Sequence, residues 1–183
     1  MARRLSGVDV PWYVAAGWSI DLFLGAQTRE HEDLEIATPA TRFAEVAAAL
    51  TELEFFAIVD RVAYSIEREP HALIGSHQTW GLDRRTGVWR IDVFREPSDG
   101  ETWICRRDDS IRMSRREHIE WTGDGIPYAR PEVTLLFKAK HARPKDDGDL
   151  SAVLAVLDRN RRRYLADLLE TVHPGHRWLG CIT

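Results

Sequence analysis

Cysteine, methionine and long apolar runs are scarce in this sequence of 183 residues. The two cysteines, Cys105 and Cys181, lie far apart and form no C-x-x-C pair, which argues against a disulfide framework. No segment approaches the roughly 18 consecutive apolar residues of a membrane span, and no secretory signal core follows the first residues. These absences predict a cytoplasmic protein with no membrane segment.

An excess of positive charge is also missing. The formal net charge of -4 argues against a general nucleic-acid binder, although a local basic patch could still hold a polyphosphate. An apolar fraction of 44%, with seven Trp and six Phe, is ample for a packed interior. We therefore expect a single compact unit with an appendage, because 183 residues is close to the usual size of one domain.

The apolar pattern predicts an α+β fold, with a small mixed β-sheet flanked by helices. Residues 19–24 have helical character, and Gly25 is a typical helix stop. Residues 34–37 are predicted as a strand, and Thr38-Pro39 as the cap of an amphipathic helix over 42–53. Further strands are predicted at 55–59, 63–66 and 88–94, with a turn at 83–87.

Helical patterns dominate the last third of the chain. Pro131 opens a predicted helix over 131–140, and two further helices are predicted at 149–157 and 161–172. The Gly- and Pro-containing segment 123–127 separates these helices from the strands. We therefore expect a core over residues 1–125 and a helical C-terminal segment over 126–183 that packs on it.

Three acidic residues in the strands suggest a metal site. If residues 33–35 are extended, Asp33 and Glu35 point to one face and Leu34 to the other. Asp92 lies within the apolar strand 88–94, where it shares a face with Arg90 and Phe94 and need not be buried. Three convergent carboxylates repel one another unless a cation or proton intervenes, so the group favours a divalent ion.

The segment around these acids resembles the nucleotidyltransferase fold shared by DNA polymerase beta and the aminoglycoside nucleotidyltransferases. That pattern has a glycine turn, an acid-x-acid pair on one strand and a third acid on a neighbouring strand. The resemblance is strongest to the subgroup acting on the 2″ hydroxyl of aminoglycosides, with its Gly-Gly-Trp-x-Ile-Asp, Leu-Gly, Thr-Arg and His-x-Asp-[Ile/Leu]-Asp runs. The matching residues here are Gly17-Trp18-Ser19-Ile20-Asp21, Leu24-Gly25, Thr28-Arg29 and His31-Glu32-Asp33-Leu34-Glu35.

Two positions depart from that pattern. Ala16 stands where the family usually has the first glycine, which affects how closely the backbone can approach a phosphate. Glu35 replaces the usual second aspartate, so the carboxylate is retained on an arm longer by one methylene. Octahedral Mg²⁺ is demanding about such changes, and the resemblance therefore leaves open an altered metal preference or a loss of catalysis.

The resemblance implies in-line attack by a substrate hydroxyl on the α-phosphorus of ATP or another nucleoside triphosphate. Asp33, Glu35 and Asp92 would be the catalytic residues and the ligands of Mg²⁺, with Mn²⁺ as the alternative. Asp92 is also the candidate general base. A run in the helical part, similar to one in many small bacterial nucleotidyltransferase-like proteins, adds cations. The nucleotide-binding candidates are Gly17, Trp18, Arg29, His31, Lys138, Arg143 and Lys145.

Each of these candidates also has an ordinary structural interpretation. His31 could position Asp33 or serve as a structural hydrogen-bonding residue, and Trp18 is predicted to be part of the core. Lys138, Arg143 and Lys145 lie beside several aspartates and could form surface ion pairs instead of contacts to phosphate.

The acceptor implied by the resemblance is a small molecule, with an aminoglycoside antibiotic as the first choice. Scattered acids that could meet its ammonium groups are Glu67, Glu69, Glu96, Asp99 and Glu101, although they are equally compatible with ordinary surface charge. Two alternatives remain: a non-catalytic or partner-regulated protein of the toxin and antitoxin type, and a transferase acting on protein or tRNA. The sequence is compatible with a homodimer.

Overall fold

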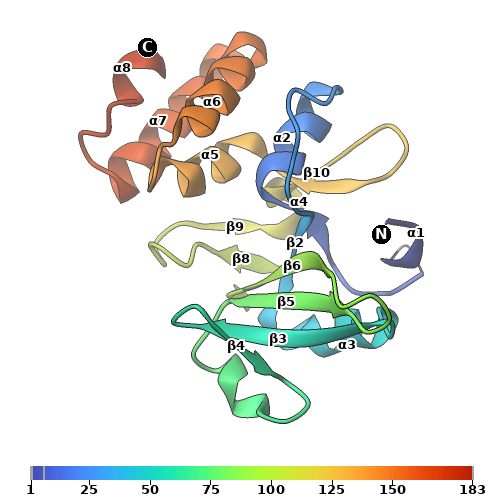
Figure 1. Ribbon diagram of the computed structural model, residues 1–183. Coiled ribbons are helices and arrows are strands. Elements are labelled where there is room, and N and C mark those ends of the chain that lie inside the picture. Colours follow the sequence, from blue (N-terminus) through green and yellow to red (C-terminus); the bar gives the residue numbers. More distant parts are fainter. Residues whose placement is uncertain (1, 6, 183) are drawn as a thin grey trace. The chain divides into compact units, whose positions relative to one another are not determined.

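The computed structural model describes residues 2–5 and 7–182, and its contacts form two compact units. Unit 1 contains the residues up to Val14 together with His31–Arg115 (Figure 1). Unit 2 contains Ala15–Glu30 and the chain from Arg116 onward.

The predicted domain boundary between residues 125 and 126 stays a prediction. Residues 123–127, predicted to separate strands from helices, lie in and just after the turn of a β-hairpin.

Unit 1 is built on a mixed sheet. Its strand order is β1-β2-β6-β5-β3-β4, in which β2 and β6 are parallel and the other neighbours are antiparallel. The strands are β1 (Tyr13–Val14), β2 (Glu35–Pro39), β3 (Leu53–Val59), β4 (Val62–Ser65), β5 (Gln78–Asp83) and β6 (Trp89–Glu96). The predicted α+β class with a mixed sheet is confirmed.

One face of this sheet carries the core of unit 1. Helix α3 (Phe43–Ala49) packs there through Phe43 and Val46, and the Phe43 and Phe55 rings meet edge to face at 5.5 Å. Ile36 and Val93 are fully buried and lie opposite each other on β2 and β6. Apolar burial of this kind is the main source of stability for a small sheet.

The remaining elements of unit 1 are α1 (Ala2–Leu5), the short 3₁₀ helices Ala40–Arg42 and Pro70–Leu73, and a separate sheet of β7 (Ser98–Asp99), β8 (Thr102–Ile104) and β9 (Arg112–Ser114).

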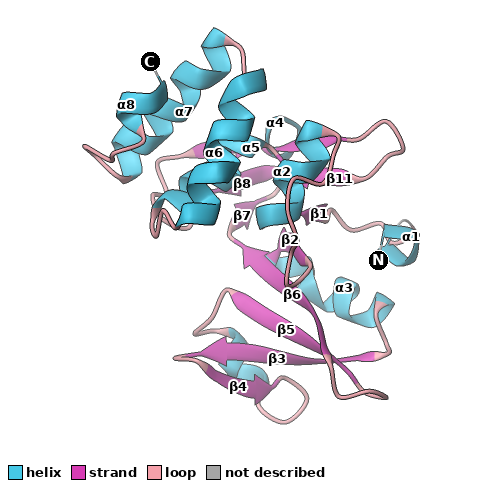
Figure 2. Ribbon diagram, turned by 45° about the horizontal axis from the view of Figure 1, so that its top comes forward, coloured by secondary structure: helices cyan, strands magenta, loops and turns pink. Residues whose placement is uncertain are grey.

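Unit 2 is mainly helical (Figure 2). Helix α5 contacts α2, α6 and α7, and its Leu135 and Leu136 are fully buried. Trp178 is also buried, and its indole N–H donates to Asp147 Oδ1 at 2.7 Å. The elements of this unit are α2 (Ala16–Leu24), α4 (Arg115–His118), β10 (Ile119–Trp121), β11 (Pro127–Ala129), α5 (Pro131–Ala139), α6 (Pro144–Val156), α7 (Arg159–Val172) and α8 (Leu179–Ile182).

A buried ion-pair network holds the start of α5. The Glu132 carboxylate is fully buried and accepts hydrogen bonds from Arg161 Nε at 2.6 Å and from Arg130 Nη2 at 3.1 Å. Burial alone would raise the pKa of Glu132, but the two guanidinium groups outweigh that effect and lower it.

Among the described residues, no helix has the length and apolar character needed to cross a membrane.

Several predicted elements have different limits in the structure. The cap predicted at Thr38-Pro39 precedes the short 3₁₀ helix Ala40–Arg42, whose N-cap is Pro39; α3 itself begins at Phe43, and Pro39 is also the last residue of β2. Strand β5 was not predicted. Helix α6 begins at Pro144, five residues before the predicted start, and the Asp146 side chain accepts from the Arg143 backbone N–H at 3.0 Å. That capping interaction satisfies one of the donors left open at a helix start.

Candidate active site

Two of the predicted catalytic acids lie next to each other on parallel strands of unit 1. Glu35, the first residue of β2, is in register with Asp92 on β6, and the Asp92 N–H donates to the Leu34 carbonyl at 2.9 Å. Asp92 is in turn opposite Trp80 on β5, and Trp80 is opposite Phe56 on β3. Residues that pair directly across strands point to the same face, so Glu35, Asp92, Trp80 and Phe56 form a row across the sheet, on the face away from α3.

Asp33 lies close to this row but not on the strand. It occupies a bend before β2 and is exposed, so the predicted alternation of Asp33 and Glu35 along one strand is not what the structure shows. Its negative charge nevertheless acts on the Asp92 carboxyl and raises its pKa. The three predicted acids are therefore brought to one region of unit 1.

Asp92 is buried, whereas the sequence predicted that it need not be, because its side chain is covered by residues of the unpredicted strand β5. It is 5% exposed, and the Gln78 amide donates a hydrogen bond to its Oδ2 atom. Burial raises the pKa of Asp92 to about 7, against the opposing effect of Gln78 and of the Trp80 indole. Within the described chain, no donor is in hydrogen-bond geometry to the other oxygen, Oδ1.

The chemistry of these acids is compatible with a cation. The Oδ1 atom of Asp92 is a buried acceptor that needs a partner, and the Asp33 charge nearby opposes its ionisation. Oxygen ligands of this kind are those that Mg²⁺ prefers. In the described part of the chain, no group of three or more His, Cys, Asp or Glu side chains is spaced closely enough to hold a metal ion. The three acids are therefore of the chemical type that binds a divalent ion, and the metal site itself stays a prediction.

The glycine turn of the motif opens helix α2 in unit 2. Ala16, which replaces the usual first glycine, has φ of +51°, a left-handed conformation that glycine adopts far more readily than alanine. Gly17 follows at the helix start, where backbone N–H groups are left without intrahelical partners. Ser19 Oγ donates to the Ala16 carbonyl at 2.8 Å and lies 2.8 Å from Thr134 Oγ1. These side-chain bonds hold the turn against α5.

The residues after the turn have structural partners. Gly25 ends α2 with φ of +72°, as predicted, and the buried Asp21 accepts from the Thr28 N–H and hydroxyl at 3.1 and 2.5 Å. The predicted core residue Trp18 is half-buried, as is His31 in unit 1. Asp21 therefore orients the loop that leads to Arg29.

Three of the four cations predicted to bind phosphate pair with α6 carboxylates. Arg29 forms a two-pronged ion pair with Asp149, at 3.0 and 3.2 Å. Lys138 Nζ lies 3.2 Å from Asp146 and 2.9 Å from Asp149. Arg143 pairs with Asp146 at 2.9 Å, whereas the Lys145 side chain is exposed. Their nucleotide-binding role stays a prediction.

The scattered acids predicted for an acceptor cleft are also partly paired. Glu67 pairs with Arg84, Glu101 lies 3.2 Å from Arg115, and the buried Glu96 lies 3.7 Å from Arg106. The other two, Glu69 and Asp99, lie in different segments of unit 1. Ion pairing of this kind leaves fewer carboxylates for a polycationic acceptor.

Sequence reasoning missed two groups of residues near Asp92. Gln78 and Trp80 lie on β5, whose alternation was masked by Gly81, and a Cβ at Gly81 would lie 2.7 Å from Ile91 Cγ2. Arg106 is the other residue that sequence reasoning missed. Its positive charge favours the ionised form of Asp92 and so lowers the pKa of that carboxyl. Its position directly before Arg107 is the sequence signal that could have indicated a basic site.

Comparison with known proteins relates the chain to one enzyme class. A family model described as aminoglycoside-2″-adenylyltransferase matches residues 1–82. Relatives from Escherichia coli and Klebsiella pneumoniae, each named 2″-aminoglycoside nucleotidyltransferase, are 25% identical over 134 residues, which is 73% of this chain and 73% of each relative. The chain is a nucleotidyltransferase. Its predicted resemblance to the aminoglycoside 2″-nucleotidyltransferase subgroup is thereby confirmed.

Solved structures of nucleotidyltransferases share the fold. One is ANT(2″)-Ia in complex with adenylyl-2″-tobramycin, with a TM-score of 0.63, 15% identity and 92% of both chains covered. Another is the lincosamide antibiotic adenylyltransferase LnuA with lincomycin bound, with a TM-score of 0.55, 16% identity, and 84% of this chain and 91% of LnuA covered. In this nucleotidyltransferase, the match to the family model includes Asp33 and Glu35, while Asp92 lies beyond it.

Proposed function

We propose that the nucleotidyltransferase moves a nucleoside monophosphate from ATP, or another nucleoside triphosphate, to a hydroxyl group of a small molecule in the cytoplasm. The observation that carries this proposal is the carboxyl of Asp92, which is buried in register with Glu35 on the sheet face away from α3 and lies within range of the Asp33 charge. The acceptor oxygen would attack the α-phosphorus, the bond from that phosphorus to the bridging oxygen would break, and pyrophosphate would leave.

Asp92 would serve as the general base of this reaction. Its pKa of about 7, raised by burial, is well suited to accept a hydroxyl proton near neutral pH, because general bases work best when their pKa lies near the operating pH. Gln78 would orient the carboxylate through the hydrogen bond to Oδ2, which leaves Oδ1 for the incoming group. The proton released by the acceptor would then reside on Asp92.

Asp33, Glu35 and Asp92 would also hold Mg²⁺, with Mn²⁺ as the alternative. A bound divalent ion neutralises charge that develops on the phosphate oxygens during transfer. The buried Oδ1 of Asp92 and the repulsion from Asp33 support this assignment, since a cation would offset both. Oδ1 cannot hold the ion and take the proton at once, so binding of the ion there is the alternative to the base role of Asp92. Gly17, Trp18, Arg29, His31, Lys138, Arg143 and Lys145 remain the proposed nucleotide contacts. Arg29 and Lys138 would exchange part of their α6 ion pairs for phosphate oxygens.

We further propose that the acceptor is an antibiotic carrying free hydroxyl groups. The named relatives are 2″-aminoglycoside nucleotidyltransferases, and the structural neighbours carry adenylyl-2″-tobramycin and lincomycin. Kanamycin, tobramycin and lincomycin are therefore the first acceptors to test.

The test is transfer of label from α-³²P-ATP to each antibiotic by the wild type and by Asp92→Asn, with Mg²⁺ or Mn²⁺ present. We expect a labelled product with the wild type and its loss in the variant. Asp83→Asn is the matched control, because Asp83 caps a surface turn through the Arg85 and Thr86 N–H groups. Equal transfer by wild type and Asp92→Asn would contradict the assignment of the base. Absence of transfer to any small molecule, together with metal-dependent nucleotide binding, would favour a protein or tRNA acceptor.

A further inference from the structure

Three aromatic side chains gather on the sheet face that carries Asp92. Phe56, Trp80 and Trp89 come from β3, β5 and β6, and we call them the aromatic cluster. The Trp89 ring meets the other two edge to face, with centroids 5.3 Å from Phe56 and 5.5 Å from Trp80. Trp80 is directly opposite Asp92, and its indole N–H donates a hydrogen bond to the Asp92 carboxyl. The aromatic cluster is therefore continuous with the proposed base.

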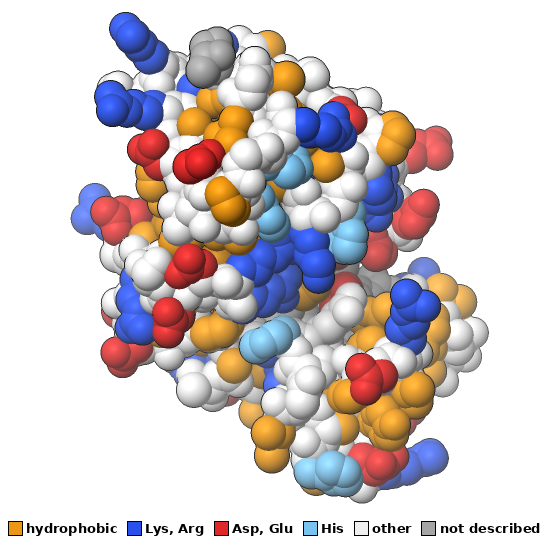
Figure 3. All heavy atoms as spheres, turned by 90° about the vertical axis from the view of Figure 1, so that its left-hand side faces the viewer, with side chains coloured by type: hydrophobic (Ala, Val, Ile, Leu, Met, Phe, Trp, Pro, Cys, Tyr) orange, Lys and Arg blue, Asp and Glu red, His pale blue; other side chains and the backbone are white. Residues whose placement is uncertain are grey.

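The aromatic cluster reaches the surface of unit 1. Trp89 is 45% exposed, Val88 before it is also exposed, and Phe56 and Trp80 are half-buried. Figure 3 shows hydrophobic side chains that lie at the surface between charged ones. Single exposed apolar residues are ordinary in proteins, but a contiguous group of aromatic rings beside polar site residues is typical of a ligand-binding surface.

A carboxylate lies on the same face beside the aromatic cluster. Glu54 on β3 is directly opposite Leu82 on β5, and Leu82 is opposite Trp89, so these side chains form a second row across the sheet. The Glu54 carboxylate accepts from the Ser65 hydroxyl at 3.1 Å. In the part of the chain that the structure describes, no Lys, Arg or His side chain forms an ion pair with Glu54. Its negative charge is therefore available to a cation from outside the chain.

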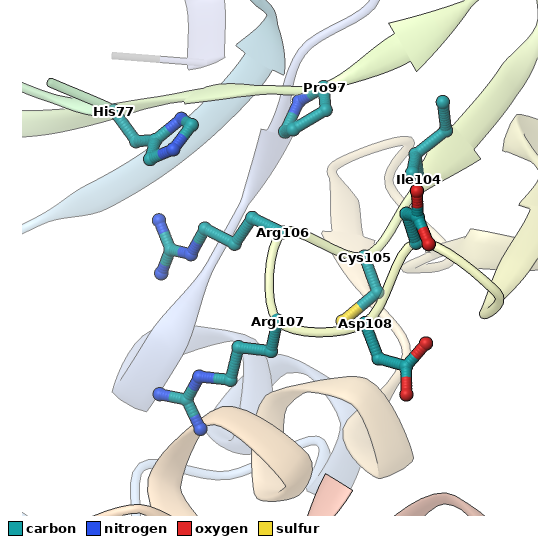
Figure 4. Close-up of a pocket in the computed structure, with 8 residues that line it drawn as sticks. His77, Pro97, Ile104, Cys105, Arg106, Arg107 and Asp108 are labelled. Carbon is teal, nitrogen blue, oxygen red and sulfur yellow. The ribbon is translucent and has the colours of Figure 1, made fainter. Parts of the chain in front are cut away.

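The next aromatic ring along β6 differs from the aromatic cluster, because a cation of the chain already lies over it. Phe94 shares a face with Asp92, and the Arg106 guanidinium lies 5.0 Å from the centre of its ring. Figure 4 shows Arg106 and Arg107 extending in the same direction from the turn between β8 and β9. Over the described residues, no Lys or Arg side chain stacks on a ring of the aromatic cluster. A positively charged ligand would therefore be repelled on the Phe94 side and accepted on the side of the cluster.

The chemistry of this surface fits a ring compound that carries amino groups. The face of an aromatic ring is electronegative and attracts an ammonium group, most strongly when the ring is that of tryptophan. A carboxylate adds a charge-assisted hydrogen bond to the same kind of group. Aromatic rings also provide flat apolar surface against which the C–H groups of a sugar ring can pack.

We infer that the aromatic cluster and Glu54 bind an amino-sugar ring of the acceptor, with the ring against Trp89 and an ammonium group on the Glu54 carboxylate. This inference rests on the proposed function. Trp80 joins the two parts of the site, because it contacts the Trp89 ring and also donates to Asp92. A hydroxyl group of an acceptor held on the cluster would then lie beside the proposed base, and Glu54 would supply the negative charge that the paired acids of unit 1 do not.

The experiment measures binding of kanamycin by calorimetry, with saturating Mg²⁺ and α,β-methylene ATP, a nucleotide analogue that cannot transfer its α-phosphoryl group. The second probe is fully N-acetylated kanamycin, which keeps the rings and hydroxyl groups but has no ammonium charge. The variants are Trp89→Ala, Trp89→Phe and Glu54→Gln. Trp121→Ala and Glu170→Gln are the matched controls, because both side chains are exposed and lie in unit 2. Circular dichroism of each variant checks that it is folded.

We expect kanamycin to bind the wild type, and its N-acetylated form to bind roughly tenfold more weakly or less. Trp89→Ala should weaken kanamycin binding by about fivefold or more, which is the usual effect of removing a cation–π contact, and Trp89→Phe should retain most of the binding. Glu54→Gln should weaken kanamycin binding by about tenfold and leave binding of the N-acetylated form unchanged, since only charge is removed. Both controls should bind kanamycin as the wild type does, and every variant should bind the analogue normally.

Several results would overturn the inference. Weaker analogue binding by Trp89→Ala would assign the aromatic cluster to the base of the nucleotide. Analogue binding without kanamycin binding, equal binding of the two kanamycin forms, or unchanged kanamycin binding by Trp89→Ala and Glu54→Gln would exclude an amine site on this surface and leave the proposed transferase intact. Failure of the analogue to bind the wild type would refute the proposed function and, with it, the acceptor role of the aromatic cluster.

Discussion

Replacing Asp92 with asparagine should stabilise the protein at alkaline pH while abolishing transfer. The Asp92 carboxyl is 5% exposed, and burial raises its pKa from 3.8 to about 7. Between these two values the unfolded chain has released the proton and the folded chain has not. Because the folded state binds more protons there, the free energy of unfolding falls as the pH rises.

The size of this effect follows from the two pKa values. Each pKa unit corresponds to about 1.4 kcal/mol, so the buried carboxylate lowers the stability at pH 8 by about 4 kcal/mol and at pH 4 by less than about 1 kcal/mol. Asparagine removes this pH dependence and keeps an oxygen that can accept from Gln78, although its own N–H groups need partners that could cost about 1–3 kcal/mol. That cost is independent of pH. The wild type should therefore lose about 3–4 kcal/mol relative to Asp92→Asn between pH 4 and pH 8.

Urea unfolding followed by tryptophan fluorescence, in EDTA and at intervals between pH 4 and pH 8, measures this difference. Asp83→Asn is the control, because hydrogen bonds from the Thr86 and Arg85 backbone lower the pKa of Asp83 and its removal should bring no alkaline gain. Added Mg²⁺ should stabilise the wild type more at pH 8 than at pH 5 and should have little effect on Asp92→Asn. Parallel stability curves for wild type and Asp92→Asn would refute the reasoning, since they would mean that the carboxyl is not desolvated in the folded state.

Three further predictions concern stability and are measured by urea unfolding at pH 7. Ala16→Gly should raise the free energy of unfolding by up to about 1 kcal/mol, because φ of +51° is strained for alanine; a loss of stability would contradict that conformation. Gly81→Ala should lower it by about 1–3 kcal/mol, since the added Cβ would lie 2.7 Å from Ile91 Cγ2, and an unchanged midpoint would show that the sheet can relax. Glu132→Gln should lower it by about 3–5 kcal/mol, because Arg130 and Arg161 both lose the buried charge with which they pair and Arg161 is then left with Glu120, and a smaller effect for Glu132→Gln than for Gly81→Ala would argue against the buried network.

The strands with clear apolar alternation could be predicted from the sequence, and so could the helices with clear stop signals. The end of α2 at Gly25 is an example, because a left-handed residue at that position needs glycine. Pro39 was predicted only as a helix cap, but proline is common both at helix starts and at strand positions that need no N–H donor. The structure shows both: Pro39 is the N-cap of Ala40–Arg42, and β1 pairs with β2 only as far as Ala37, so the strand pairing described on that side needs no donor from Pro39.

The acids of the candidate site could be named from the motif, but their environment could not. The sequence placed Asp92 on a strand, and burial of its side chain depends on β5, whose Gln78 and Trp80 lie beside it. That strand was missed because Gly81 weakens the alternation, and Gly81 is there because its neighbours on β3 and β6 leave no room for a Cβ. The packing requirement for glycine at position 81 thus made β5 hard to predict from the sequence, and β5 is the strand beside which Asp92 is buried.

The motif identifies Asp92 as the proposed base, but it does not determine the pKa of that base. An aspartate on a strand has a pKa near 4 when water reaches both oxygens, and would then be a weak base for a hydroxyl proton at neutral pH. In this chain, burial raises the pKa of Asp92 and the charge of Asp33 adds to the rise, while Gln78, Trp80 and Arg106 limit it. Substitutions at Gln78, Trp80 and Arg106 should therefore shift the pH at which transfer is half-maximal while leaving the three proposed catalytic acids in place. The acid-x-acid motif specifies where the chemistry takes place, and residues outside the motif determine the pH range in which it can proceed.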